Sequence, residues 1–562
     1  MHRLMSVLEA VNGVLWHDAV LFTVLGVGVL FTLWSGFGQY RALTHGVQVI
    51  RGLYDRKDDP GAINHFQALS TALSATVGLG NIAGVAIAIS LGGPGAVFWM
   101  WVTGLVGMAL KMTEVIQAML YRTFDAAGQP HGGAMWVIRR GLAQRSPRLA
   151  SLGSFLGGVF CVTLLVSAIT GGNMFQAWNV ADVTNAYFGV PGMVTGAVMT
   201  VLVGMVILGG ITRIGSVTGK LVPLMCGLYI LAGLVVIALR IEQVPDAIRL
   251  VFASAFRPAE AQGAFLGGVA GWAFLRGMQR ALFSNEAGQG SAPIAHSAAR
   301  TDEPVREGVV AGLEPFVDTL CVCTITALVI LLSGAWNRGP DILFPAGTGP
   351  RLVEVAPAQW APELTTVEGL AGWPAGQDVY LVVRGDVHPQ RGTDSHRLYG
   401  EVVRVDGSSS IAWQPLPSNA APRLAQPGLY AEYKGATLTA RAFDRVVPGL
   451  GIWLVPAVAW LFAISTIISW SYYGEQGSVY LFGVRSVRPY RALYCLLVLV
   501  ASSPLIRTEA QLDVVSSLGT GVMLFANIPI MLLFGPQAMR AYHGYMARLR
   551  RGEMDRRSLG PE

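Results

Sequence analysis

ALSTALSATVGLGNIAGVAIAI, residues 68–89, is apolar over a length that would cross a lipid bilayer, yet three glycines and an asparagine interrupt its middle. A bilayer requires about 20 apolar residues per helix. Gly78, Gly80 and Gly84 surround Asn81, and each glycine weakens a helix by about 1 kcal/mol relative to alanine. The stretch is therefore prone to unwind, and unwound backbone in a bilayer is tolerated only where it lines a cavity or is buried in protein. Close packing of helices through small residues explains the glycines equally well at this point.

The composition of the whole chain is that of a membrane protein. Of its 562 residues, 52% are hydrophobic and 13% are charged, whereas soluble domains carry about 25% charged residues. The lipid bilayer is therefore the expected partner. The net charge of +6 is typical of basic cytoplasmic loops and does not indicate nucleic-acid binding. The five cysteines lie in apolar segments, so neither a disulfide framework nor a metal centre is expected.

Eleven apolar stretches predict membrane-spanning helices. They lie near 18–39, 66–90, 95–121, 153–184, 193–211, 217–240, 264–284, 306–334, 449–483, 489–505 and 512–537. Basic residues mark one side of the membrane as cytoplasmic. They include Arg41, Arg51, Arg56, Lys57, Arg139, Arg140, Arg145, Arg548, Arg556 and Arg557. The sequence thus predicts a multi-pass protein of a bacterial plasma (inner) membrane, with its N-terminus outside and its C-terminus cytoplasmic.

One long segment does not belong in a membrane. Residues 337–440 are rich in proline, glycine and charge, with alternating runs such as VYLVVRGD that are typical of half-buried strands. We expect a small β-rich extracytoplasmic domain there. It divides the chain into spans one to eight (1–336), the insertion (337–440), spans nine to eleven (441–540) and a basic cytoplasmic tail (541–562).

A second breakable stretch follows five spans after the first. RALFSNEAGQGSAPIAHSAA, residues 280–299, combines glycines and a proline with Ser284, Asn285 and Glu286. Two interrupted helices in corresponding positions of two halves are the best sequence indication of a transporter binding site. This pairing favours transport.

The ninth span, WLFAISTIISWSYYGEQ (460–476), carries hydroxyls on one helix face. Ser465 and Ser469 are separated by one helical turn, and Thr466 lies beside them. Hard cations prefer oxygen ligands, so these hydroxyls are candidate sodium ligands. Bonding back to the preceding turn of their own helix is the alternative.

Other polar residues within the spans are also functional candidates. Lys111 and Glu114 are interpreted as a structural pair. Asn173 and Gln176 offer neutral hydrogen bonds toward a central cavity. His65 and His296 are interpreted as interfacial. Five carboxylates are expected to line the path or to hold the halves together: Glu286, Glu314, Asp318, Glu475 and Asp513.

Three long motifs resemble the alanine or glycine:cation symporter family. They are TVGLGNIAGVAIAISLGGPGAVFWMW (76–101), GMQRALFSNEAGQGSAPIAHSAA (277–299) and FAISTIISWSYYGEQ (462–476). The resemblance implies an all-α fold of the neurotransmitter:sodium symporter type, with an inverted five-plus-five helix repeat in spans two to eleven and one extra N-terminal helix. It also implies sodium-coupled symport of alanine or glycine into the cell by alternating access, and no enzymatic activity.

The resemblance further implies the site residues. The amino acid would be surrounded by Thr76, Gly78, Gly80, Asn81, Gln176, Phe283, Thr466 and Trp470. Sodium would bind between the carbonyls of Ser74, Val77 and Phe462 and the hydroxyls of Ser465 and Thr466. Phe283 and Trp470 would restrict the pocket to side chains as small as that of alanine.

Two other classes of function remain open on the residues alone. A membrane sensor would bind a small solute through the same core without transporting it. A membrane-embedded enzyme would need a nucleophile–base pair or a metal cluster, and neither H-E-x-x-H nor G-x-S-x-G occurs in a suitable context.

Overall fold

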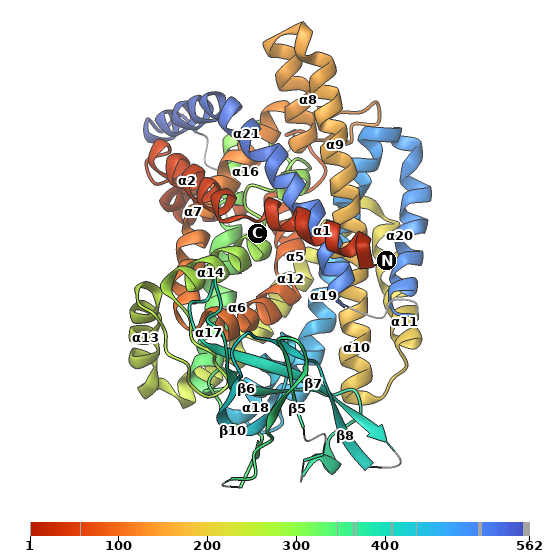
Figure 1. Ribbon diagram of the computed structural model, residues 1–562. Helices are drawn as coiled ribbons and strands as arrows, with labels where there is room; N and C mark the ends of the chain where they lie inside the picture. The colour runs from red at the N-terminus through yellow and green to blue at the C-terminus, as the bar shows by residue number, and fades with distance from the viewer. Residues whose placement is uncertain are drawn as a thin grey trace.

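The computed structural model is a helical bundle with antiparallel sheets at one end (Figure 1). It describes residues 2–56, 58–345, 347–363, 366–367, 369–405, 408–433, 435–503 and 509–554. Lys57 and the end of the tail with Arg556 and Arg557 lie outside these residues, and the side chain of Asp513 is not described either.

Seven helical stretches among the described residues are long and apolar enough to cross a membrane, and a bent pair makes an eighth. They are formed by α1 (His2–Leu15) with α2 (Asp18–Trp34), the bent pair α5 (His65–Thr76) and α6 (Val85–Gly92), α7 (Gly95–Tyr121), α9 (Ala150–Ile169) with α10 (Gln176–Phe188), α12 (Gly210–Leu239), α16 (Pro304–Ala311) with α17 (Thr324–Ser333), α19 (Leu450–Phe482) and α21 (Glu509–Arg550).

Three of the eleven expected spans coincide with helices of only 16, 16 and 15 residues. These are α11 (Gly192–Ile207), α14 (Ala270–Asn285) and α20 (Val487–Ala501). Short helices connect the long ones: α3 (Gly38–Arg41), α4 (Val47–Ile50), α8 (Ala134–Arg145), α13 (Val244–Phe256), α15 (Ala292–His296) and α18 (Ala436–Val446). The bundle is therefore confirmed as mostly helical, with eight of the eleven spans meeting the length of a bilayer crossing.

The first helix, α1, is a feature that the sequence reading did not predict. It lies along α21, where the Asn12 amide donates to the Val514 carbonyl (2.8 Å) and the Trp16 indole donates to the Ser517 carbonyl (3.1 Å). The Trp16 ring also stacks on Phe283 of α14, with ring centroids 4.8 Å apart. This helix therefore links the two ends of the chain and covers α14.

The segment expected as an insertion contains two antiparallel sheets. A five-stranded sheet has the order β3-β10-β6-β7-β8, and a three-stranded sheet has the order β4-β5-β9. The strands are β3 (Ile342–Leu343), β4 (Leu352–Ala356), β5 (Gln359–Pro362), β6 (Asp378–Arg384), β7 (Ser395–Val405), β8 (Ser408–Trp413), β9 (Leu416–Pro417) and β10 (Arg423–Ala431). A short pair, β1 (Thr123–Phe124) with β2 (Pro130–His131), precedes α8.

The central strand β6 is buried on both faces. Val379, Leu381 and Val383 join a small core inside the sheet region. Tyr380 and Val382 point to the other face and pack with Leu266, in the segment that precedes α14. Alternate residues of a strand face opposite sides, so β6 is the layer between the core of the sheets and the helical bundle.

Several hydrogen bonds fix this contact. The Arg397 guanidinium donates to the Ala264 carbonyl (3.0 Å), and the Gln426 amide donates to the Gly263 carbonyl (2.9 Å). The backbone N–H of Val269 donates to the Arg391 carbonyl (2.9 Å). The sheets are therefore docked on the segment that leads into α14.

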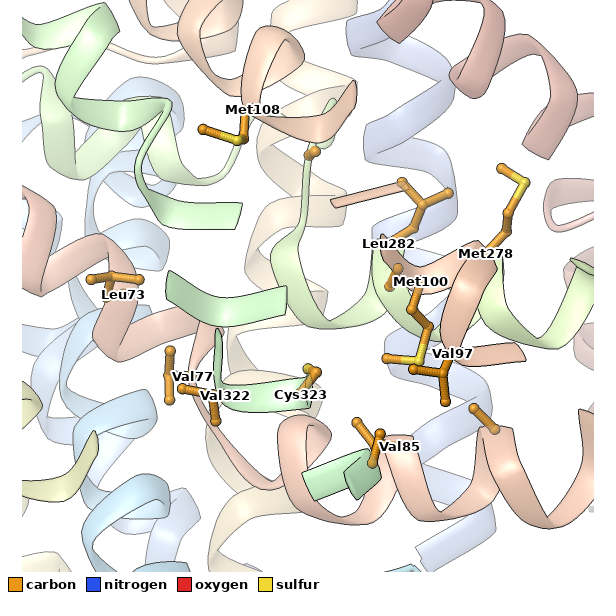
Figure 2. Packing of buried hydrophobic residues seen from close by; sticks show 14 of the residues in the cluster. Leu73, Val77, Val85, Val97, Met100, Met108, Met278, Leu282, Val322 and Cys323 are labelled. Carbon is orange, nitrogen blue, oxygen red and sulfur yellow. The ribbon is translucent and has the colours of Figure 1, made fainter. Parts of the chain in front are cut away.

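The main apolar core surrounds the bent pair α5–α6. Leu73 and Val77 on α5, Val85 on α6, and Val322 and Cys323 belong to one cluster of buried residues. Figure 2 shows these side chains beside other members of the cluster, among them Val97, Met100 and Met108 of α7 and Met278 and Leu282 of α14. Because the polar groups described next lie within this core, they are shielded from solvent.

Candidate functional site

The helix break predicted at residues 78–84 is present. The axes of α5 and α6 differ by 54°, and Val77 has an extended backbone (φ −76°, ψ 95°). A π-helical turn, Gly80–Gly84, follows. The Asn81 Oδ1 accepts a hydrogen bond from the Gly78 backbone N–H at 2.8 Å, which satisfies a donor that the break leaves without its helical partner. A Cβ atom on Gly80 would meet nothing within 4 Å, so open space lies beside the unwound backbone.

Oxygen atoms of α5 and α19 meet just before this break. The Ser74 hydroxyl donates to the Ser465 carbonyl (2.7 Å), and the Thr466 hydroxyl donates to the Ser74 carbonyl (3.1 Å). The Ser465 hydroxyl lies 2.8 Å from the Phe462 carbonyl and 3.5 Å from that of Ser74. All four side chains are buried, and Val77 begins the unwound turn next to them. The structure thus brings together the oxygens of Ser74, Phe462, Ser465 and Thr466, which we call the α5–α19 oxygen cluster.

A buried carboxylate lies on the other side of the break. The Asn81 amide donates to Asp318 Oδ1 (2.5 Å) and to the Ser284 hydroxyl (3.0 Å). Ser284 and Thr319 each donate to Asp318 Oδ2, at 2.9 and 2.8 Å. Asp318 belongs to the π-helical segment Phe316–Cys323, and Ser284 lies at the end of α14. The first break, the end of α14 and the eighth span therefore meet at one carboxylate that neutral donors surround.

Two of the expected substrate residues have other hydrogen-bonding partners. The Thr76 hydroxyl bonds back to the Ala72 carbonyl of its own helix (3.3 Å). The Gln176 amide donates to the Gly171 carbonyl (3.2 Å), while its Oε1 is buried and has no hydrogen-bond partner in the described part of the chain. Gln176 thus presents an unused acceptor at the start of α10.

The two aromatic residues expected to limit the pocket have different neighbours. Trp470 is almost fully buried, and a Cβ atom on Gly172 would lie 2.3 Å from its ring. Its ring meets that of Tyr473 edge-on at 5.3 Å. Phe283 is half-buried and stacks on Trp16. Trp470 therefore packs closely against the π-helical turn Thr170–Phe175, and Phe283 faces α1.

An open cavity of about 390 Å³ reaches Phe283 from the side of the sheets. Trp16, Arg276, Arg280 and Gln390 are among the residues that line it, so α1, α14 and the sheet region all contribute. The Arg276 guanidinium lies 4.0 Å from the centre of the Trp272 ring. Two arginines, Arg276 and Arg280, line this cavity together with His17 and Asp18.

A histidine lies in the same part of the sheet region. Burial lowers the pKa of the His388 imidazole, and the charge of Arg391 lowers it further. A histidine whose pKa falls below its ordinary value near 6.5 is mainly neutral at pH 7, so His388 adds no charge to this region.

The remaining ionisable candidates are already paired. Arg491 holds Glu475 through two bonds of 2.7 and 3.1 Å. His65 and His296, which were expected at the membrane interface, are both buried within the protein and bonded to Glu307. Lys111 lies closer to Glu314 (3.3 Å) than to Glu114 (3.9 Å). Among the described residues, no group of three or more histidine, cysteine or acidic side chains has the geometry of a metal site.

These features define a class of protein. Helices of membrane-spanning length, one of them broken beside buried polar groups and open space, are the architecture of a membrane transport protein. The chain belongs to the sodium:alanine symporter family, whose model matches residues 1–354 and 423–558. The chain is therefore a membrane transporter that couples the movement of amino acids to that of sodium, and it is not an enzyme.

Individual relatives agree with this assignment. The chain is 36% identical to the sodium/alanine symporter AgcS of Methanococcus maripaludis, over 89% of each chain. It is 33% identical to an uncharacterized transporter of Haemophilus influenzae over 98% of each chain. It is 29% identical to the putative sodium/proton-dependent alanine carrier protein YrbD of Bacillus subtilis, over 97% of this chain and 93% of that one.

Proposed function

We propose that this protein carries alanine or glycine into the cell together with sodium, by alternating access. The observation that carries the proposal is the α5–α19 oxygen cluster at the broken helix. The family membership and the name of the Methanococcus maripaludis relative support alanine as the substrate. A non-transporting sensor built on the same fold is the alternative that the uptake experiment below excludes or supports.

In this proposal sodium binds at the oxygen cluster. The carbonyls of Ser74, Val77 and Phe462 and the hydroxyls of Ser465 and Thr466 would supply only oxygen, which hard cations prefer. The hydroxyls now donate to carbonyls. Rotation of each hydroxyl would turn its hydrogen away and its lone pairs toward the ion.

The amino acid would bind in the space beside the unwound turn. The backbone at Gly78 and Gly80 and the side chains of Thr76 and Thr466 would face its carboxylate and the sodium ion. The unused Oε1 of Gln176 is an acceptor suited to its ammonium group. Asn81 would act by holding the turn open, since its side chain already bonds Gly78 and Asp318. Phe283 and Trp470 would limit the size of the side chain.

We also propose the wider arrangement. Helices from α5 to α21 would form the inverted five-plus-five repeat, with the breaks after Thr76 and Asn285 in corresponding positions. The sheets would lie outside and the C-terminus inside a bacterial plasma membrane. In support, the basic helix α8 lies at the end of the bundle opposite the sheets (Figure 1).

The same reasoning supports the proposed insertion at 337–440, whereas α21 continues past the proposed start of the tail at 541 to Arg550. The strands β3 to β10 fall between residues 342 and 431, and the family model leaves out 355–422. A family model that leaves out most of the strand region is what an insertion into the second half of the repeat would produce.

Uptake of labelled alanine by the reconstituted protein tests the proposal. An inward sodium gradient should drive accumulation, and equal sodium on both sides should not. The same accumulation in sodium-free buffer with a proton gradient would show that sodium is the wrong ion. Binding of alanine without any uptake would support the sensor.

A further inference from the structure

A chain of buried titratable side chains lies at the end of the bundle opposite the sheets. His65 of α5 bonds Glu307 of α16, whose second oxygen lies 2.5 Å from Nδ1 of His296. Nε2 of His296 lies 2.6 Å from one oxygen of Glu314, and Lys111 Nζ lies 3.3 Å from the other. These five side chains are at most 2% exposed. Helices α5, α7 and α15 and the span that begins with α16 thus contribute to one path.

The central members of the path, Glu307 and His296, are hydrogen-bonded on both of their polar ends. His296 uses one ring nitrogen for Glu307 and the other for Glu314. His65 faces Glu307 with Nδ1 and Asp55 with Nε2, at 3.6 Å from the latter. A histidine that accepts a proton on one nitrogen can release another from the second nitrogen. The geometry is therefore that of a relay.

The two ends of the path lie in different surroundings. At one end Asp55 is partly exposed, with 35% of its side chain accessible. At the other end Lys111 lies 3.9 Å from Glu114, which accepts bonds from the Gly290 N–H (3.2 Å) and the Asn527 amide (3.1 Å). The path therefore runs from solvent to the turn that follows α14.

That turn adjoins the substrate region. Glu286 begins it in the left-handed region (φ 54°) and accepts a bond from the Ser291 hydroxyl (2.5 Å). Ser284, at the end of α14, donates to the carboxylate of Asp318. A change of charge on Glu114 or Glu286 would therefore act on the residues that hold the second broken helix.

The charges of the path do not balance without protons. Glu114, Glu286, Glu307 and Glu314 are four carboxylates, and Lys111 is the one lysine among them. Burial of an uncompensated ion costs several kcal/mol. Protons must therefore reside on the histidines or on the carboxylates, and each proton has more than one acceptor within reach.

Other charged and titratable groups lie around the path, and among the residues that the structure describes they leave several of its polar atoms without hydrogen bonds. They are Arg122, Arg306, Asp59, Asp302, Asp318 and Tyr473. Lys111 Nζ, Glu114 Oε1, Glu314 Oε2 and His65 Nε2 have no hydrogen-bond partner in the described part of the chain. A fixed ion pair in this protein has a different geometry from that of the path. The Arg491 guanidinium donates to both carboxylate oxygens of Glu475.

We propose that this path carries protons between solvent at Asp55 and the turn after α14, as a second coupling route separate from the sodium cluster. A proton taken up at Nε2 of His65 would displace the proton on Nδ1 to Glu307, and Glu307 would pass a proton to His296. His296 would release the proton on its other nitrogen to Glu314. Lys111 would then release a proton to Glu114 and take up the one on Glu314. Charge on the path rises by one for each proton that enters and falls by one for each that leaves. The proposal rests on the proposed transport function, because it makes proton movement part of the same cycle.

Proteoliposomes that enclose a pH-sensitive dye test it. Labelled alanine uptake and interior pH are recorded together, in the wild type and in Glu307→Gln and His296→Gln. Glu303→Gln is the matched control, because it removes a carboxylate at the start of the same helix, outside the path. We expect interior pH to change in step with wild-type and control uptake. We expect both path variants to lose the pH change while sodium-driven uptake remains measurable.

The outcomes separate the two proposals. Sodium-driven uptake with no change in interior pH would overturn the proton path and leave sodium symport standing. Uptake driven by a pH gradient but not by sodium would support the path and overturn sodium coupling. If Glu307→Gln does not reach the membrane, the wild-type pH record and His296→Gln still decide. A pH change that survives in His296→Gln would overturn the path.

Discussion

At the scale of single residues, the hydroxyls of Ser465 and Thr466 are the most informative. Removal of either should weaken sodium activation by about 1–3 kcal/mol, the cost of losing one partner of a buried polar group. This corresponds to an increase of roughly 5- to 150-fold in the half-saturating sodium concentration. Ser465→Ala and Thr466→Ala should therefore need more sodium for alanine uptake. Ser469→Ala is the control, because Ser469 is buried on the same helix but bonds no member of the oxygen cluster. Unchanged sodium curves in both variants would remove these residues from the ion site.

Trp470 tests the size limit of the pocket. Its ring fills the space beside Gly172, so Trp470→Ala should admit larger neutral side chains and weaken competition by alanine. Inhibition of labelled alanine uptake by leucine and phenylalanine measures this. Trp453→Ala, on an exposed position of the same helix, should change nothing. A variant with the same narrow selectivity would show that Trp470 serves packing alone.

At the scale of elements, the break between α5 and α6 depends on one side chain. Asn81→Ala would leave the buried Gly78 N–H without its partner, at a cost of about 1–3 kcal/mol. It would also remove one donor from the Asp318 carboxylate, which Ser284 and Thr319 would still bond. We expect a lower melting temperature and a loss of alanine uptake. Asn185→Ala, which removes an exposed bond at the end of α10, is the control. Full uptake in Asn81→Ala would show that the glycines alone define the break.

The elements also show what the sequence could predict. Glycines are a local pattern, so the break near Gly78 was predictable from the residues. The meeting of Ser465 with the second span was predicted only from the resemblance to the symporter family. The role of Asp318 was not predictable, because its partners Asn81 and Ser284 are distant in sequence. The shared partner of His65 and His296 was not predictable for the same reason, since only the fold places Glu307 between them. α1 was missed because its packing surface lies on α21.

At the scale of the whole molecule, the sheets and the bundle share an interface at β6. Deletion of residues 340–432 with a short flexible linker should keep sodium-driven uptake, because the ion and substrate residues lie on other elements. The deletion would expose Leu266, and burial of a leucine contributes about 2 kcal/mol. We therefore expect a lower melting temperature that Leu266→Ser does not lower further. A correctly inserted deletion variant that binds alanine but does not transport it would assign the sheets to the transport cycle.

The docking of the sheets on the segment before α14 has a practical consequence. A soluble binder raised against the exposed face of the sheets would bind a domain that is hydrogen-bonded to residues 263–269. Any tilt of α14 during the transport cycle would then move the surface that the binder recognises. Such binders would fall into two groups, those that tolerate turnover and those that hold the transporter in one state. With the sheets outside the cell, as proposed above, the second group would inhibit transport from that side.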